Sequence, residues 1–195
     1  MKALVLVSLV GVMGLTARAD EAADLAAIRE RYAKIGQAKE VKTETIKFEM
    51  ESGPLDGTLT RRSYEGGLSA VQLSYSEGDH GGTDENYYFS EGKLFFILVK
   101  DSSWQFAPGS TDDKPKTIDT LTESRYYVNK GAIVQVLRRS LTAEGSKKLE
   151  GSIAKVENKK VTDDEMGRIY LKRAAVLLTL KTKEEVEKMF AAEES

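Results

Sequence analysis

Residue types that could do chemistry are concentrated in one glycine-rich segment, residues 78–85. It contains the only histidine of the chain, His80, and three acidic residues, Asp79, Asp84 and Glu85. Carboxylate oxygens are the ligands that Ca²⁺ prefers, although the spacing here differs from that of an EF-hand loop. The sequence therefore gives these three carboxylates as the candidate metal ligands.

Few other residues of the chain are candidates for an acid, a base or a nucleophile. A Ser-His-Asp mechanism would need His80, but a general base must be held rigidly and this histidine lies in a flexible loop, so we name no catalytic residue. A carboxylate pair could hydrolyse a glycosidic bond, because such pairs meet in space and not in sequence. The chain has no phosphate-binding loop, nucleophile elbow or zinc-protease motif, and we predict no cofactor.

Aromatic residues offer a different kind of site. Two similar segments each contain a Tyr-Tyr pair, and a tryptophan lies between them; the candidate ligand-binding residues are Tyr87, Tyr88, Tyr126, Tyr127 and Trp104. Aromatic rings give a ligand a large contact area at small entropic cost. The alternative is that the tyrosines are strand formers that pack across a sheet.

Alternating polar and apolar residues predict that these aromatics lie on strands. Residues 85–99 and 124–137 align on Gly92 and Gly131, and each segment is typical of two strands around a tight turn. Successive hairpins without helical crossovers indicate an antiparallel meander. Both faces of the strand at 93–99 are apolar, which is typical of a central strand that is covered on both sides.

Helices are expected on either side of this sheet region, which we place at 42–139. Apolar residues three and four apart predict a helix over 20–37 and a helical C-terminal region over 162–193. We therefore predict an α+β fold: an antiparallel β-meander of about six or seven strands with an N-terminal helix and C-terminal helices packed on it. Within the sheet region, residues 102–120 are expected to form a long connection between two hairpins.

Two capping boxes are predicted in the C-terminal region. Thr162 with Glu165, and Thr182 with Glu185, have the spacing at which a threonine hydroxyl and a glutamate carboxylate satisfy the free amides of a helix start. The run at 174–180 fits either a helix or a strand.

The first nineteen residues predict export. Lys2 precedes an apolar stretch from Ala3 to Leu15, and Ala17-Arg18-Ala19 forms a small-x-small cleavage site, so residues 1–19 have all three parts of a signal peptide. The apolar stretch is shorter than the roughly 20 residues of a membrane-spanning helix. We expect a single globular domain over 20–195, no membrane span after cleavage, and a periplasmic or secreted location.

Composition narrows the classes of partner. Lys2 and Arg18 are two of the 29 basic residues, so cleavage leaves 27 against 31 acidic residues, a formal charge of −4. Bases and acids are interleaved, which argues against a nucleic-acid partner. The chain has no cysteine, which excludes disulfides and thiolate metal sites.

Three segments together resemble a group of uncharacterised bacterial exported proteins and lipoproteins: Ile28 to Ile35, Tyr87 to Phe96, and Arg125 to Gly131. In that group an N-terminal helix precedes hairpins with Tyr-Tyr-Phe motifs. The resemblance covers residues 25–140 or so and implies a bacterial envelope setting, but no activity. Val128 stands where an aromatic is usual.

These observations lead us to expect a non-catalytic exported binding or interaction protein, whose partner is a protein, glycan or lipid of the cell envelope. Its ligand would lie on the sheet face bearing Tyr87 or Tyr88 and Tyr126 or Tyr127. Two alternatives stay open. One is a small secreted hydrolase that uses a carboxylate pair or a loop-bound metal. The other is a lipid carrier with an apolar cavity between sheet and helices.

Overall fold

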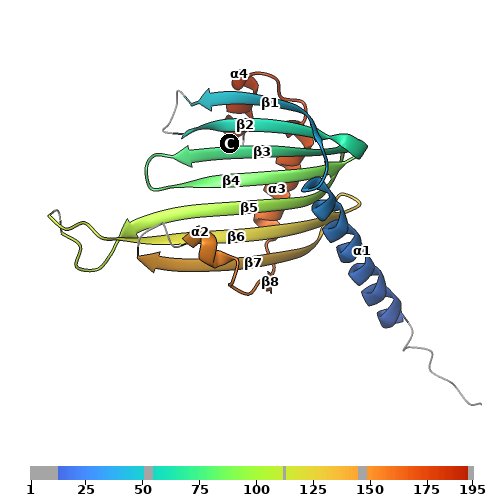
Figure 1. Cartoon of the computed structure of the whole chain (residues 1–195), viewed down its shortest axis with the longest axis horizontal. Coiled ribbons are helices and arrows are strands. Elements are labelled where there is room, and N and C mark those ends of the chain that lie inside the picture. The colour runs from blue at the N-terminus through green and yellow to red at the C-terminus, as the bar shows by residue number, and fades with distance from the viewer. Residues whose placement is uncertain (1–12, 51–54, 112, 145–148, 193–195) are drawn as a thin grey trace, which may run out of the picture.

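A computed structural model describes residues 13–50, 55–111, 113–144 and 149–192 of the chain (Figure 1). The helices are α1 (Met13–Ile35), α2 (Leu149–Ile153), α3 (Asp164–Leu177) and α4 (Lys183–Ala191). The strands are β1 (Glu40–Glu49), β2 (Leu55–Tyr64), β3 (Leu68–Glu77), β4 (Gly81–Ser90), β5 (Lys93–Phe106), β6 (Thr117–Asn129), β7 (Ala132–Glu144) and β8 (Lys159–Val161).

All eight strands form one open sheet in the order β1 to β8, and each pairs antiparallel with its neighbours in the chain. The predicted α+β class and antiparallel meander are therefore confirmed. The strand number is eight and not six or seven. The additional strand is β8, whose three residues are too few to show an alternating pattern.

The two tyrosine-rich hairpins have the same local geometry. Glu91-Gly92 and Lys130-Gly131 both have positive φ at both positions, as a two-residue type I′ turn requires. In each hairpin the register shifts directly after the Tyr-Tyr pair, between Tyr88 and Phe89 and again after Tyr127. The alignment of the two segments on their glycines thus extends to the turn and the bulge.

One face of the sheet, here called the inner face, packs against α3 and α4. Its strand residues include Leu59, Val71, Tyr87, Ile97 and Tyr126, all at most 1% exposed. The helices contribute Tyr170, Ala174, Leu177, Val186 and Phe190 to the same cluster. Figure 1 shows both helices behind the strands.

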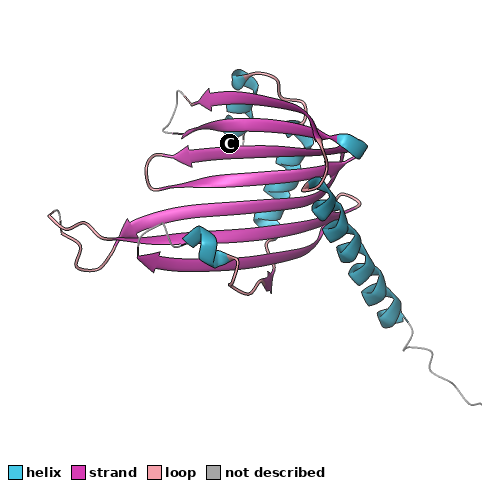
Figure 2. Cartoon of the chain, in the orientation of Figure 1, coloured by secondary structure: helices cyan, strands magenta, loops and turns pink. Residues whose placement is uncertain are grey.

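The opposite side, here called the open face, is covered only in part. Helix α1 packs on one end of β5 and β6, where Ile28 and Ile35 contact Phe96 and Tyr127. The short α2 packs near the other end of β6 and β7, over Leu121. Figure 2 shows one end of α1 close to the end of β4, where Tyr32 packs on Tyr88, and no described α-helix in front of the rest of β1 to β4. Residues 95–99 of β5 are buried, as expected of a central strand.

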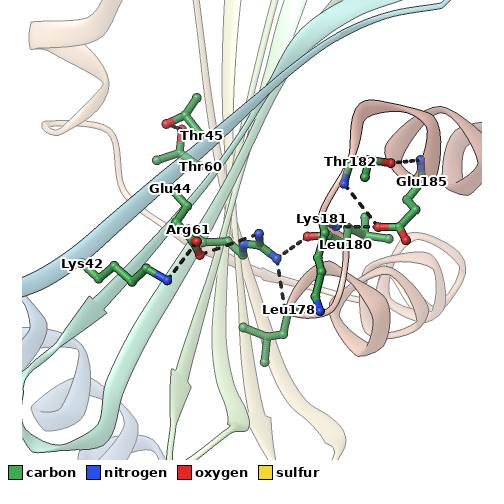
Figure 3. Close-up of polar contacts among 10 residues, drawn as sticks. All are labelled: Lys42, Glu44, Thr45, Thr60, Arg61, Leu178, Leu180, Lys181, Thr182 and Glu185. Atoms are coloured by element: carbon green, nitrogen blue, oxygen red, sulfur yellow. Dashed lines mark hydrogen bonds and ion pairs between the residues drawn. The ribbon is translucent and has the colours of Figure 1, made fainter.

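An arginine connects the α3–α4 turn to the sheet. Nη1 of Arg61 donates to the carbonyl oxygens of Leu178, at 3.3 Å, and Leu180 (Figure 3). The same guanidinium lies 3.8 Å from the Glu44 carboxylate of β1. Arg61 therefore satisfies two backbone carbonyls that directly follow the end of α3.

The two predicted capping boxes have different outcomes. At α4 the box is present, because Glu185 N donates to the Thr182 hydroxyl and Thr182 N donates back to the Glu185 carboxylate (Figure 3). At α3 the prediction is wrong. The N-cap is Asp163, and no side chain caps the helix. The Asp163 carboxylate instead accepts from Tyr126 and Arg138.

One further expectation is corrected, and one open alternative is resolved. The long connection predicted over 102–120 is limited to 107–116, because β5 continues to Phe106 and β6 begins at Thr117. The ambiguous run at 174–180 is helical as far as Leu177.

The predicted signal peptide lies largely outside the described residues, which begin at 13. The helix expected over 20–37 is present as the greater part of α1, which ends at Ile35. Within the described part of the chain, no helix is long and apolar enough to cross a membrane.

Candidate functional site

A groove of about 1130 Å³ lies on the open face. Its floor consists of two adjacent rows of residues that cross the sheet from β1 to β5. The first row is Lys47, Thr58, Ser74, Asp84 and Lys100; the second is Glu49, Asp56, Ser76, Gly82 and Ser102. Because strand side chains alternate between faces, all ten positions face the same side.

The two rows form the polar floor of the groove, and α2 lies at its far side. Glu150 and Ile153 of α2, with Leu121 of β6, line the groove there. Some floor groups bond to one another: Ser76 Oγ donates to Asp56 Oδ1 at 3.2 Å, and Ser102 Oγ donates to the Gly82 carbonyl at 3.0 Å. The floor thus mixes hydroxyl groups with charged groups.

Charges in the groove are nearly balanced. Seven charged side chains line it: Lys47, Lys100, Lys183, Glu49, Asp56, Asp84 and Glu150, which is three lysines against four carboxylates. Among the described residues, none of these seven takes part in an ion pair within 4.0 Å. Within the described part of the chain, their charged ends are therefore not neutralised by ion pairs.

A cluster of three rings adjoins the groove; we call it the aromatic platform, and it consists of His80, Trp104 and Phe106. Trp104 follows Ser102 on the same side of β5, one row beyond the floor. The His80 and Trp104 rings stack with centroids 4.6 Å apart, and Phe106 meets the indole edge-on at 5.3 Å. Trp104 Nε1 donates to the Asp79 carbonyl, which fixes the indole.

A second, smaller hollow lies between α1 and the sheet; we call it the helix pocket. It has a volume of about 150 Å³ and is lined by Ile28, Arg29, Tyr32, Phe96, Leu98, Arg125 and Tyr127. The Arg29 guanidinium lies 5.6 Å from the Tyr127 ring centre. The pocket lies on the same side of β5 as the groove, since Leu98 and Lys100 are two residues apart on one strand.

The five aromatic residues chosen from the sequence do not share one surface. Tyr87 and Tyr126 belong to the core of the inner face, at 0% and 1% exposure. Tyr88 and Tyr127 point to the open face and pack under α1, where Tyr127 lines the helix pocket. Trp104 is in the aromatic platform, away from all four tyrosines.

The three carboxylates chosen as metal ligands are not brought together either. Asp84 and Glu85 are neighbours in β4 and therefore face opposite sides of the sheet. Asp84 is in the groove, whereas Asp79 is in the exposed turn before β4, beside His80 Nε2 at 3.4 Å. Within the described residues, no group of three or more His, Asp or Glu could hold a metal ion.

Glu85 is instead the centre of a buried polar cluster on the inner face. Its carboxylate is fully buried, accepts from Tyr75 Oη at 2.8 Å and from Tyr87 Oη, and is paired with Arg173 of α3. Burial, and then the nearby Glu85 charge, raise the pKa of Tyr75 and of Tyr87 above their usual range. These partners occupy both carboxylate oxygens, so Glu85 has a structural role.

The first row of the groove leads, past Lys100, to a second buried carboxylate on the open face. Glu123 accepts from Nη2 of Arg125 at 2.6 Å and of Arg139 at 2.8 Å. Burial alone would raise the pKa of Glu123, but hydrogen bonds and charge from the two guanidinium groups outweigh it and hold that pKa below its usual range. Glu123 therefore stays ionised.

A carboxyl with the raised pKa that suits a general acid lies elsewhere. Burial raises the pKa of Asp101, against a hydrogen bond from Thr83 at 2.9 Å. Asp101 follows Val99 on the inner-face side of β5, so it points away from the groove.

Of the groove floor, sequence reasoning named only Asp84, although a signal for the other residues existed. The strands at 42–50 and 68–76 have a polar side, and those polar residues became the floor. What no local pattern indicated was that this polar side would stay uncovered, because the covering helices come from distant parts of the chain.

No protein-family model, curated protein or solved structure was found to match this chain. The function is therefore argued from the geometry of the site alone.

Proposed function

We propose that this chain is a non-catalytic, exported binding protein of the bacterial cell envelope, and that it holds a polar ligand in the groove on the open face. The observation that carries the proposal is the groove itself: about 1130 Å³ of space over ten residues from five strands. Ligand pockets typically have volumes of about 300 to 1,000 Å³, so the groove is large enough for an extended ligand.

The chemical groups that line the groove support binding of a polar molecule. The floor offers hydroxyl donors and acceptors, lysine donors and carboxylate acceptors, and its charged ends have no ion-pair partner in the described residues. Export is supported by the three-part pattern of residues 1–19.

Binding without catalysis is supported by where the perturbed carboxyl groups lie. Asp101, whose pKa is raised, is on the inner face, and Glu123, whose pKa is lowered, is held between two arginines. The hydrolase alternative would have to use groove carboxylates such as Asp56 and Asp84. It predicts that a cleaved product of the ligand appears.

The lipid-carrier alternative would have to use the helix pocket, which is the apolar hollow between sheet and helix. At about 150 Å³ it has the volume of about five water molecules, or of one benzene ring, so it is too small for a long acyl chain.

The test is a ligand titration of the purified protein and two variants, read by calorimetry and by melting temperature. Ser74→Tyr places a ring in the middle of the groove floor, at a strand position where tyrosine is well tolerated. Thr142→Tyr is the matched control, because Thr142 is an exposed strand hydroxyl outside the groove. The panel contains neutral oligosaccharides, peptides, fatty acids and divalent metals.

We expect one class of ligand to raise the melting temperature of the wild type and of Thr142→Tyr, because a ligand that binds only the folded state stabilises it. Ser74→Tyr should lose that response. A ligand that binds Ser74→Tyr as tightly as the wild type would place the site elsewhere, a cleaved ligand would support the hydrolase, and no response to any class would remove the proposal.

A further inference from the structure

We infer that the groove ligand is an uncharged saccharide chain, one of whose end sugars stacks on the aromatic platform of His80, Trp104 and Phe106. This inference rests on the proposed function and names the ligand class for the same site. It combines three observations: the charge balance of the lining, the chemistry of the floor, and the position of the platform.

Charge balance excludes a strongly charged ligand. With three lysines and four carboxylates around the groove, the net charge of the lining is −1. A polyanion such as a nucleic acid or an anionic headgroup would meet repulsion from Asp56, Asp84 and their neighbours, and a polycation would meet the lysines. A neutral molecule with many hydroxyl groups satisfies donors and acceptors without a net charge.

The floor is suited to hydroxyl groups more than to a peptide. Ladder pairing engages the backbone of β2 to β4 on both sides, so only side chains meet a ligand here, whereas strand addition needs a free sheet edge. Three apolar side chains that line the groove, Phe48, Leu121 and Ile153, are at most 8% exposed. They offer a peptide no apolar pocket for its side chains.

The aromatic platform provides what a polar floor lacks, a flat apolar surface. One face of a pyranose ring presents C–H groups, and an aromatic ring covers such a face at small entropic cost. Phe106 is 61% exposed, and the Trp104 indole is fixed by His80 and by the Asp79 carbonyl. His80 and Phe106 are exposed and Trp104 is half-buried, and exposed apolar surface of this kind is typical of a recognition surface.

The groove floor and the aromatic platform are close enough to form one site. Along β5, Lys100, Ser102, Trp104 and Phe106 follow one another at every second residue on the same side of the sheet. Successive positions of this kind are about 7 Å apart along a strand, so the platform lies directly beyond the end of the floor. A chain of sugars on the floor therefore reaches the indole.

Trp104 is the only tryptophan of the protein, so its fluorescence reports on this site alone. The experiment titrates the purified protein with cellohexaose, chitohexaose and maltohexaose, and separately with a neutral hexapeptide and with phosphatidylcholine and phosphatidylglycerol vesicles. We expect a saturable change in tryptophan emission with at least one saccharide and none with the other probes.

Variants locate the contact, with calorimetry as the readout because Trp104→Ala has no tryptophan. Trp104→Ala should weaken saccharide binding about tenfold or more, as loss of a buried aromatic contact does at other interfaces, and Trp104→Phe should restore part of it. Val41→Ala, which shortens another exposed apolar side chain in β1, should bind as the wild type does.

Each of the other outcomes overturns a defined part of the two proposals. Binding of the hexapeptide, blocked by Ser74→Tyr, with no saccharide binding would overturn this inference but keep the proposed function. Saccharide binding that Trp104→Ala leaves unchanged would remove the platform from the site. A change in emission with vesicles alone would make the aromatic platform a membrane contact, and no binding of any probe would overturn both proposals.

Discussion

Arg173 of α3 and Glu85 of β4 form an ion pair whose side chains are 6% and 0% exposed. The aromatic rings of Tyr75 and Phe190 lie 5.8 and 5.2 Å from the guanidinium carbon. The pair connects two elements far apart in the chain, and its desolvation is offset only if both partners are present. It therefore fixes where α3 sits on the sheet.

Removing one partner of this pair should destabilise the fold strongly. Glu85→Ala leaves Arg173 with an uncompensated buried charge, and we expect a loss of about 3 to 5 kcal/mol in the free energy of unfolding. The double variant Glu85→Leu/Arg173→Met should recover much of that loss, because it buries no charge. Urea denaturation measures both.

The matched control is the exposed pair between Glu30 and Lys34, whose nitrogen and oxygen lie 2.8 Å apart on α1. Glu30→Ala should leave the free energy of unfolding almost unchanged, because solvent screens an exposed pair. If Glu85→Ala costs as little as this control, the inner-face pair is not buried in solution.

Tyrosines around the Glu85 cluster should make the protein sensitive to alkali. Burial is the first cause that raises the pKa of Tyr75, Tyr87, Tyr126 and Tyr170; the second is the nearby Glu85 charge or, for Tyr126, a hydrogen bond to Asp163. A raised pKa means that the stabilisation is complete below the pKa of the unfolded chain, about 10, and is lost as pH rises above it. The free energy of unfolding should thus fall steeply between pH 9.5 and about 11.

Each such tyrosine should contribute about 1.4 kcal/mol per pH unit to that fall. Tyr170→Phe should therefore lessen the slope by one proton, as measured by urea denaturation at several pH values. Phenolate absorbance gives an independent check, since these tyrosines should ionise only as the protein unfolds. Titration of all eight tyrosines near pH 10 in the folded protein would contradict the prediction.

Local sequence patterns were sufficient to predict most of the sheet. Alternation in β1, β3 and β4, and the glycines of the Tyr-Tyr hairpins, indicate strands and turns directly, because a pleated strand and a type I′ turn each constrain the residues that form them. The extension of β5 to Phe106 was missed because Asp101 to Ser103 interrupt the apolar pattern and Pro108 with Gly109 suggests a loop. The short α2 and β8 have no periodicity to detect.

The site could be predicted only in part. Sequence alternation places Tyr87 and Glu85 on one side of β4 and Tyr88 and Asp84 on the other, but it does not tell which side the helices cover. Coverage depends on α3 and α4, which follow the sheet by many residues. Trp104 was recognised for its type alone, and its stacking with His80 depends on a contact between two strands.

Acid should destabilise the protein through Glu123. The arginines that flank it hold its pKa below the usual range, so its contribution is complete above the pKa of the unfolded chain, about 4.3, and is lost as pH falls through the folded pKa. Glu123→Gln should lose about 3 kcal/mol at pH 7 and then depend less on pH below 5 than the wild type does. Urea denaturation between pH 3 and 7 measures both effects.

Glu49→Gln is the control for that series, because Glu49 is an exposed carboxylate of the groove without an ion-pair partner in the described residues. Its pH dependence should match that of the wild type. A Glu123→Gln variant whose stability falls in acid as steeply as the wild type would show that Glu123 is not held by its arginines.

Close contact between β2 and β3 beneath the groove depends on Gly57. A β-carbon at this position would lie 2.2 Å from the Ser74 carbonyl oxygen and 2.7 Å from Cζ of Phe48. The first of these is a backbone atom of the neighbouring strand, so relief requires the strands to separate, whereas a side chain could rotate. We expect Gly57→Ala to destabilise the protein by about 3 kcal/mol or more, in spite of the smaller entropy that alanine has in the unfolded chain.

Gly151→Ala provides the comparison, because nothing lies within 4 Å of a β-carbon built there and the residue is inside α2. It should be neutral or should stabilise by up to about 1 kcal/mol through helix propensity. Because Ser74 is in the groove floor, Gly57→Ala should also weaken any ligand that the wild type binds there, whereas Gly151→Ala should not. Equal stabilities of the two variants in urea would mean that β2 and β3 are farther apart in solution than here.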